Sequence, residues 1–403
     1  MIEQSDPNSP LYSTKSFEEM NLRPELLKAI YALKYNKPSR IQEHSIPNIL
    51  ADPMKHFIGQ AQSGTGKTCA FSLSMLSRSD PSIKKTQALC CAPTRELARQ
   101  IYEEVKKLAK FTTFEILLVV KDSPVPKRTD AQVIIGTPGR IIDLIRRRAI
   151  ETQAIKIYVL DEADVMLDIQ GLADQSTRIQ KSLPKTCQIA LFSATYKEKV
   201  TQFAAKVVPN PKVVIRLKPE ELSLEKIQQY YIDCKTEDNK FKILSEIYGF
   251  ITVGASIIFV QTRKTAQELS KKMQAEGHQV SLLHGFDMAP EERDKVIDDF
   301  RANKTRVLIT TNVLARGIDI LQVSLVINFD LPLTGDNQPD PETYLHRIGR
   351  SGRFGRHGIA INLIHDDNSR KVMLAIQQHF QKEIKPLPVE KIDNLSKMLE
   401  EIQ

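Results

Sequence analysis

Apolar residues follow two alternating patterns along this chain. Short runs rich in β-branched residues are typical of buried strands. Longer stretches with apolar residues every three or four positions, such as 95–107 and 264–275, are typical of amphipathic helices. Their alternation predicts an α/β protein with mainly parallel sheets flanked by helices. The strands are expected at 88–92, 132–136, 157–160 and 189–193, and then at 256–260, 280–283, 307–310, 325–328 and 359–363.

The strands form two sets, one before and one after residue 220, which predicts two domains of similar size. A chain of 403 residues also exceeds what one hydrophobic core usually serves. Residues 216–223, between the sets, are mostly polar and contain a proline and two glutamates. We therefore predict a first domain over residues 1–218, a linker over 219–223 and a second domain over 224–403.

The chain has 57 lysines and arginines against 49 aspartates and glutamates, a net charge of +8. This excess fits a nucleic-acid partner and fits equally a well-solvated basic enzyme surface, so charge leaves both interpretations open. The five cysteines show no metal-ligand spacing, which indicates a reducing compartment. Because the longest apolar runs are too short to cross a bilayer and the first ten residues are polar, we expect an intracellular soluble protein.

The segment 61–68 (AQSGTGKT) has the residue types of a phosphate-binding loop. It follows an apolar segment and opens a helix-compatible run, so it lies at the carboxyl end of a strand, where ligands collect in open parallel sheets. Gly64 and Gly66 let backbone amides converge on phosphate oxygens. Lys67 can reach the β- and γ-phosphates, and the Thr68 hydroxyl can bind Mg²⁺. A structural turn without nucleotide is the alternative, and the Gly-Lys-Thr spacing favours the nucleotide site.

Residues 161–164 (DEAD) follow directly on the strand predicted at 157–160. A carboxylate at a strand end, downstream of a phosphate-binding loop, suits a second contact to Mg²⁺, and we assign that role to Asp161. Glu162 can orient or deprotonate the attacking water. The same four residues could instead be a helix N-terminus whose acids complement the macrodipole. The preceding strand and the upstream loop favour ATP hydrolysis.

Residues 346–353 (HRIGRSGR) place three arginines within seven residues, at a predicted helix start. Fixed guanidinium groups suit the negative charge that develops on a transferred γ-phosphate. A basic helix facing RNA or solvent is the alternative, and it would be preferred if no ATP site faced this segment.

Together these motifs resemble those of the DEAD-box helicases, over nearly the whole chain from about residue 17 to the C-terminal helix. The resemblance implies two tandem RecA-like domains, each a mainly parallel sheet flanked by helices. It also implies an RNA-stimulated ATPase that couples ATP binding and hydrolysis to gripping, unwinding and remodelling RNA. ATP and Mg²⁺ would be its cofactors, and single-stranded RNA or mRNA–protein particles its substrates.

The resemblance also assigns residues to the ATP site. In 37–42 (KPSRIQ), the amide of Gln42 offers adenine both a donor and an acceptor, and upstream Phe17 would stack on the ring. Taken alone, Gln42 would be an ordinary surface helix residue and Phe17 an ordinary core aromatic. The implied catalytic residues are Lys67, Glu162, Arg350 and Arg353, and the implied nucleotide-binding residues are Phe17, Gln42, Ser63, Gly64, Thr65, Gly66, Lys67, Thr68, Asp161, Gly317 and Asp319, with Thr68 and Asp161 on the metal.

A second set of residues would bind the sugar–phosphate backbone of one RNA strand. Two segments, 93–98 and 137–140, follow strands at helix openings, where backbone amides and hydroxyls bind phosphate well. Backbone contacts carry no sequence information, so we expect weak base preference. Ser193 and Thr195 would couple nucleotide state to domain closure, with a serine/threonine turn as the alternative. The implied RNA-binding residues are Arg95, Thr137, Gly139, Arg140, Arg263, Gly285, Thr310 and Thr311.

Several positions depart from the general family pattern. Ala61 replaces the first glycine of the phosphate loop, and Asn312 stands where many members have aspartate, with little consequence expected. Residues 121–123 replace a Gly-Gly pair, and the segment 286–293 lacks a usual glutamine. The 121–123 variant and the long connection at 331–342 resemble the nuclear mRNA-export members of the family.

That narrower resemblance implies mRNA export through the nuclear pore. A pore activator acting with inositol hexakisphosphate and a pore filament protein would be partners. The protein would occur in cytoplasm and nucleus, at the cytoplasmic face of the pore, as a monomer. Two alternatives stay open, a translation-initiation-type helicase and an ATP-locked RNA clamp that serves as an assembly platform. A DNA translocase would differ at Gln42 and around 161–164.

Overall fold

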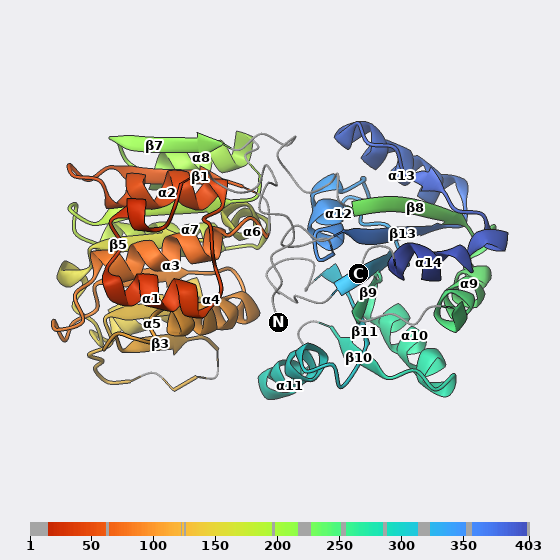
Figure 1. Ribbon diagram of the computed structural model, residues 1–403, viewed down its shortest axis with the longest axis horizontal. Helices are drawn as coiled ribbons and strands as arrows, with labels where there is room; N and C mark the ends of the chain where they lie inside the picture. Colours follow the sequence, from red (N-terminus) through yellow and green to blue (C-terminus); the bar gives the residue numbers. More distant parts are fainter. Residues whose placement is uncertain are drawn as a thin grey trace. The chain divides into compact units, whose positions relative to one another are not determined.

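The chain divides into two compact units, Met1–Leu222 and Ser223–Gln403, each an α/β domain (Figure 1). The computed structural model describes residues 15–61, 64–121, 123–124, 126–195, 198–216, 227–250, 255–284, 288–312, 323–351 and 357–400. The linker predicted at 219–223 lies outside these residues, so the predicted boundaries stay a prediction.

The first unit is built on a parallel sheet whose described strands have the order β3-β4-β2-β5-β6-β1-β7. The strands are β1 (His56–Gln60), β2 (Ala88–Cys91), β3 (Ile116–Val119), β4 (Val133–Gly136), β5 (Ile157–Leu160), β6 (Gln188–Ser193) and β7 (Lys212–Arg216). The helices are η1 (Glu18–Met20), α1 (Pro24–Ala32), α2 (Arg40–Leu50), α3 (Lys67–Arg78), α4 (Arg95–Leu108), α5 (Pro138–Arg146), η2 (Thr152–Ala154), α6 (Ala163–Asp168), α7 (Leu172–Ser182) and α8 (Glu198–Val207).

Alternate residues of the central strands bury their side chains on opposite faces of this sheet. In β5, Ile157 and Val159 join the apolar cluster formed with α1 to α4. Tyr158 and Leu160 join the cluster formed with α5, α7 and α8. Because both faces are covered, all four side chains are fully buried, which explains why the central strands read as continuous apolar runs.

The second unit repeats this plan with a parallel sheet whose described strands have the order β10-β11-β9-β12-β13-β8-β14. Helices α9, α10 and α14 cover one face, and α11, α12 and α13 cover the other. The elements are β8 (Ile227–Asp233), α9 (Glu237–Phe250), β9 (Ala255–Phe259), α10 (Arg263–Ala275), β10 (Val280–Leu283), α11 (Pro290–Arg301), β11 (Val307–Thr310), β12 (Val323–Asn328), α12 (Pro341–Ile348), β13 (Gly358–Ile364), α13 (Asp367–Phe380), β14 (Lys385–Pro386), η7 (Val389–Lys391) and α14 (Asn394–Glu400).

Every strand predicted from the sequence is present, within one or two residues at each end. One helix prediction is wrong, because the segment 346–353 was expected to begin a helix and instead holds the end of one. The Asp340 carboxylate accepts from Thr343 N at the start of α12, Pro341 takes the first position, and Gly349 follows the last. All five cysteines are free and buried. None of the described helices is long and apolar enough to span a membrane.

Candidate functional site

The loop between β1 and α3 has the geometry of a phosphate cradle. Its first amide, Ala61 N, donates to Ser193 O at 3.1 Å, which ties the loop to the end of β6. Gly64 and Gly66 have φ angles of 82° and 97°, a left-handed conformation that glycine adopts without strain. Helix α3 begins at Lys67, so its first turn offers backbone amides to an anion. The Lys67 ammonium is buried and donates to the Ala61 carbonyl.

The predicted adenine-binding residue lies against this loop. Gln42 and Ser39 form a capping box at the start of α2, in which Gln42 Oε1 accepts from Ser39 N at 2.8 Å. The other end of the amide, Nε2, donates to Gly66 O at 3.2 Å. One hydrogen of Nε2 and one lone pair of Oε1 are left over, the donor and acceptor that an adenine edge needs. Gln42 is buried, so the alternative of an ordinary surface residue is wrong.

Phe17 lies in the hydrophobic core of the first unit. Its side chain is fully buried, in the same cluster as Met20 and Leu26. This burial is what the core interpretation expects, and the stacking role predicted for Phe17 stays a prediction.

Two adjacent buried carboxylates follow β5. The Asp161 amide donates to Cys91 O at 3.1 Å, and Asp161 Oδ1 accepts from Glu162 N at 2.9 Å. Glu162 immediately precedes α6 and has a φ of 51°, a left-handed conformation that typically costs a non-glycine residue about 1–3 kcal/mol. Within the described part of the chain, Glu162 Oε2 is buried without a hydrogen-bond partner. Strain and an unpartnered oxygen at one residue favour a reactive role over a purely structural one.

The electrostatics of this site favour a divalent cation. Burial, and then the charge of Glu162, raise the pKa of Asp161 to about 7, with Asp164 adding to the effect and Lys67 opposing it. The cluster of three buried carboxylates is therefore short of positive charge. Oxygen donors of this kind fit Mg²⁺, and Thr68 and Asp161 are the residues that would hold it.

The coupling segment at the end of β6 contacts both parts of the ATP site. Thr195 Oγ1 donates to Asp164 Oδ2 at 3.1 Å, which connects the segment to α6. Ser193 O accepts from Ala61 N, which connects the segment to the phosphate loop. The Ser193 hydroxyl is buried, and no described residue pairs with it. The predicted residues therefore converge on one hydrogen-bonded site.

Two predicted RNA-binding arginines converge on the turn 120–123. Arg95, the first residue of α4, donates from Nη1 to Lys121 O at 2.5 Å. Arg140, on α5, donates from Nε to Val120 O at 3.1 Å and from Nη2 to Ser123 O at 2.7 Å. This turn replaces the family's usual Gly-Gly pair, and it supplies the carbonyl groups that orient both guanidinium groups.

Thr137 and Gly139 lie at the start of α5. Thr137 occupies the N-cap position without a side-chain capping bond, so its hydroxyl is not committed to the helix. Both residues are half-buried. A Cβ atom at Gly139 would lie 3.3 Å from Gln175 Oε1, a close approach that leaves little room for a larger side chain.

In the second unit, Arg263 begins α10 and is exposed, and Thr262 caps that helix by accepting from Thr265 N at 3.0 Å. Thr310 and Thr311 are buried at the end of β11. Arg350 follows α12 and donates from Nε to His346 O at 3.0 Å. The remaining predicted site residues, Ser63, Gly285, Gly317, Asp319 and Arg353, lie outside the described residues.

Sequence reasoning missed the role of Arg347 in this unit. The side chain is fully buried, and Nε donates to Asn312 Oδ1 at 3.0 Å. Nη1 donates to Asn328 Oδ1 at 3.0 Å and to Asp330 O at 2.6 Å. The expectation that Asn312 has little consequence is therefore wrong, because Asn312 binds a buried guanidinium group. A signal was present in the sequence, since only one of the three arginines of 346–353 had no assigned role.

Comparisons with known proteins agree with this site. A DEAD/DEAH box helicase model matches residues 39–203, and a helicase conserved C-terminal domain model matches residues 239–355. ATP-dependent RNA helicase DBP5 of Scheffersomyces stipitis is 53% identical over 401 residues, covering 99% of this chain and 80% of that protein. The Saccharomyces cerevisiae helicase of the same name is 53% identical over 401 residues, with 99% and 83% covered. The chain belongs to the DEAD-box helicases.

Solved structures of S. cerevisiae Dbp5 resemble this DEAD-box chain. The complex with RNA and ADP BeF3 matches with a TM-score of 0.92 at 52% identity, covering 96% of this chain and all of that one. A variant bound to a Gle1 variant and IP6 matches with a TM-score of 0.85 at 52% identity, covering 97% and 99%. A variant with Nup159, a Gle1 variant, IP6 and ADP matches with a TM-score of 0.70 at 48% identity, covering 95% and 99%.

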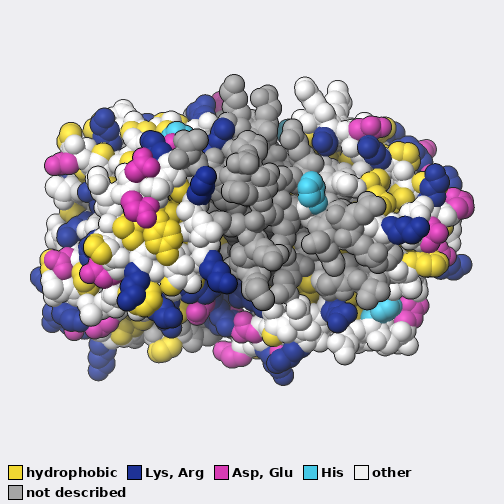
Figure 2. All heavy atoms as spheres, in the orientation of Figure 1, with side chains coloured by type: hydrophobic (Ala, Val, Ile, Leu, Met, Phe, Trp, Pro, Cys, Tyr) yellow, Lys and Arg dark blue, Asp and Glu magenta, His cyan; other side chains and the backbone are white. Residues whose placement is uncertain are grey.

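The comparisons confirm the main expectations from the sequence. The fold is two tandem RecA-like domains, and the protein is an ATP-dependent RNA helicase and RNA-stimulated ATPase. On the face drawn in Figure 2, lysines and arginines are interspersed with acidic side chains on each unit. The net charge of +8 is thus not gathered into one patch on that face.

Proposed function

We propose that this DEAD-box helicase couples ATP hydrolysis to local gripping and remodelling of RNA in mRNA export. The observation that carries the proposal is the hydrogen-bonded ATP site in the first unit. There the phosphate loop, the carboxylates and the coupling segment are joined by the Ala61–Ser193 and Thr195–Asp164 hydrogen bonds. A change at the nucleotide therefore acts on the segment that couples it to RNA.

Each residue of the ATP site has a role in hydrolysis. The amides at the start of α3 and the Lys67 ammonium bind the phosphates, and Lys67 leaves the Ala61 carbonyl to do so. When bound, ATP would supply the phosphoryl group, and Mg²⁺ would neutralise the negative charge of its phosphates. Glu162 orients the attacking water and accepts its proton at Oε2. Arg350, with Arg353, stabilises the charge that develops on the γ-phosphate.

The RNA strand is held through its backbone by both domains. In the first, Arg95 and Arg140 supply charge, and Thr137 and Gly139 supply a helix start with an uncommitted hydroxyl. The second domain adds Arg263, Gly285, Thr310 and Thr311. We propose domain boundaries at 1–218 and 224–403, with residues 219–223 as the hinge about which closure couples ATP to RNA.

Two solved complexes of a relative support a location at the nuclear pore. S. cerevisiae Dbp5 variants have been solved with Gle1 and IP6, and with Nup159 as well. We extend these partners to this chain as a pore activator acting with inositol hexakisphosphate and a pore filament protein. The helicase then works at the cytoplasmic face of the pore, where remodelling releases exported mRNA–protein particles.

The first test compares ATP turnover with and without RNA in the wild type and in Glu162→Gln. The wild type should be slow alone and strongly stimulated by RNA. Glu162→Gln should lose about 10²–10⁴-fold in turnover and remain trapped on RNA with ATP. Glu151→Gln, which removes an exposed carboxylate paired with Lys85, is the matched control. Equal wild-type rates with and without RNA would contradict the coupling, and normal turnover in Glu162→Gln would contradict its assignment as base.

The second test adds the pore activator and inositol hexakisphosphate to the RNA-stimulated assay. Stimulation by the pair, and not by either component alone, is the expected result. If the pair did not stimulate turnover, the proposed role at the nuclear pore would be wrong, and a general cytoplasmic helicase would be indicated.

A further inference from the structure

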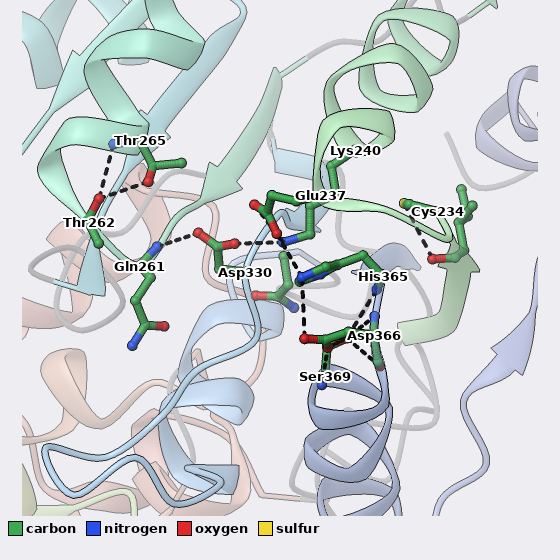
Figure 3. Close-up of polar contacts among 12 residues, drawn as sticks. Cys234, Glu237, Lys240, Gln261, Thr262, Thr265, Asp330, His365, Asp366 and Ser369 are labelled. Carbon is green, nitrogen blue, oxygen red and sulfur yellow. Dashed lines mark hydrogen bonds and ion pairs between the residues drawn. The ribbon is translucent and has the colours of Figure 1, made fainter.

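Asp330 is the meeting point of four segments in the second unit, and Figure 3 shows two of its contacts, those to Gln261 and Lys240. Its amide donates to Phe259 O at 3.2 Å, and its own carbonyl accepts from Arg347 Nη1 at 2.6 Å. Oδ1 accepts from Lys240 Nζ at 2.9 Å, and Oδ2 accepts from Gln261 N at 2.8 Å. The residue therefore connects the end of β9, helix α9, helix α12 and the turn that opens α10.

The contact to Gln261 bears on RNA binding. Gln261, Thr262 and Arg263 form the turn at the start of α10, and Arg263 is the predicted RNA contact of that turn. Gln261 is exposed, so its amide would otherwise bond to water. A hydrogen bond to an ionised carboxylate is stronger and more directional than one to water, and it holds the turn in one conformation.

Lys240 holds the Asp330 carboxylate in place. Its side chain is only 3% exposed, and its ammonium lies 2.9 Å from Asp330 Oδ1 and 5.0 Å from the centre of the Phe329 ring. Its other carboxylate partner, Glu237 at 3.3 Å, is 58% exposed and also contacts His365 at 2.8 Å. A buried ammonium that loses Asp330, the less exposed of its two carboxylate partners, is left with the solvent-screened Glu237. Lys240 and Asp330 therefore act as one unit.

We propose that Asp330 is a positioning residue for RNA binding, which fixes the turn 261–263 through the Gln261 amide while Lys240 fixes Asp330. The inference rests on the proposed RNA role of Arg263. It is separable from ATP hydrolysis, because Arg347 bonds to the backbone carbonyl of Asp330, and a change of the side chain leaves that bond in place.

The experiment uses the full chain with Asp330→Asn. The carboxamide keeps the shape, but its single oxygen cannot serve both Gln261 and Lys240. The RNA concentration for half-maximal ATPase stimulation should rise about threefold to tenfold, which is part of the free energy of one charge-assisted hydrogen bond. The KM for ATP and the plateau rate at saturating RNA should change less than about twofold, because the bond from Arg347 persists. Asp299→Asn on α11, which removes a 2.8 Å ion pair with Lys304, is the matched control and should leave the RNA requirement unchanged.

A double variant separates positioning from folding. In Asp330→Ala no side-chain oxygen is left for the Gln261 amide, and Lys240 loses its 2.9 Å partner. In Asp330→Ala/Lys240→Met the buried ammonium is gone as well, so the unfolding temperature lost in Asp330→Ala should recover, but the RNA concentration for half-maximal stimulation should stay raised. Recovery of both together would overturn the proposal in favour of a structural role. The proposal would also be overturned if Asp330→Asn needed no more RNA for half-maximal stimulation than the wild type, while Arg263→Ala weakened RNA binding. Failure of the proposed function itself would look different, because the wild type would then show no RNA stimulation.

Discussion

Thr195 Oγ1 donates a hydrogen bond to Asp164 Oδ2 at 3.1 Å and so joins the end of β6 to the first turn of α6. Asp164 is buried and lies three residues after Asp161, which would hold Mg²⁺. Helix α6 is short, so displacement at one end moves the other. The bond therefore gives the nucleotide a direct mechanical link to the coupling segment.

Thr195→Val should uncouple RNA remodelling from ATP hydrolysis. Valine keeps the shape of threonine but leaves Asp164 Oδ2 without this donor, a loss worth about 1–3 kcal/mol in a buried site. Strand separation should fall about tenfold, and RNA-stimulated ATP turnover by a smaller factor. Thr177→Val is the control, because Thr177 donates only to Ala173 O within α7. Equal losses of strand separation and turnover would mean that the bond maintains the site and not the coupling.

Asp161→Asn should stabilise the protein while abolishing ATP hydrolysis. The folded pKa of Asp161 is about 7 against an ordinary value of 3.8, so the folded state holds its proton more tightly than the unfolded state does. Stability is therefore lost as pH rises from about 4 to about 7, and the full cost applies above that range. Asparagine avoids the cost, so its unfolding temperature should exceed the wild-type value at pH 8 and approach it at pH 4.

Asp80→Asn provides a control of opposite sign. The hydroxyl and amide of Ser82 hydrogen-bond to Asp80 and lower its pKa, so its contribution is present at neutral pH and lost in acid. Its removal should lower the unfolding temperature at pH 8. If Asp161→Asn also lowered it, the buried carboxylates would have to be stabilised by contacts other than the Lys67 charge.

The sequence predicted the central strands and the ATP motifs because both are local signals. Ile157 to Leu160 form an apolar run because both faces of the sheet are covered. Lys67 and Asp161 follow strands of a parallel sheet, so they lie at the edge where the carboxyl ends of the strands meet. The edge strand β7 was not predicted, because its side chains are only half-buried and it lies directly before the polar stretch taken as a linker. Burial of Phe17 depends on packing from distant elements, so no local pattern could separate a core aromatic from a stacking one.

The partners in the polar junctions of the second unit were also beyond local signals. Lys240 and Asp330 are 90 residues apart, and Arg347 and Asn312 are 35 apart. No local pattern indicated the partner of Lys240, Asp330 or Arg347, and Asn312 was expected to have little consequence. Their roles follow from the sheet order, which brings the ends of β9, β11 and β12 together.

Asp366→Ala should destabilise the second unit by about 1 kcal/mol, the usual cost of losing an N-cap. Asp366 caps α13 by accepting from Ser369 N at 2.7 Å, and the Ser369 hydroxyl and amide lower its pKa. A lowered acid pKa means that the contribution is present at neutral pH and is lost as pH falls through the folded pKa. The difference in unfolding temperature between variant and wild type should therefore shrink in acid. Asp367→Ala, next to the cap, is the control, and an equal effect there would indicate helix charge and not capping.

Asn312→Asp should stabilise the protein, because it gives the buried Arg347 a charged partner. The guanidinium donates to Asn312, Asn328 and the Asp330 carbonyl, all neutral oxygens, and burial lowers the pKa of Arg347 to about 9 despite the opposing charges of Asp330 and Asp340. Asn312 is exposed, so a carboxylate there keeps part of its hydration while it pairs with the guanidinium. The gain should be roughly 1–3 kcal/mol, the difference between a neutral and a charge-assisted hydrogen bond at a buried group.

Chemical unfolding of the full chain checks this, with Asn337→Asp as the control. Asn337 is exposed in a turn, so the same added charge should change the unfolding free energy by less than about 0.5 kcal/mol. An Asn312→Asp variant no more stable than the wild type would mean that three neutral oxygens already balance the desolvation of Arg347. If Asn312→Asp is more stable than the wild type and its RNA-stimulated turnover is slower, the asparagine favours mobility of Thr310 and Thr311 over stability. The aspartate that many family members have would then hold these two threonines more rigidly.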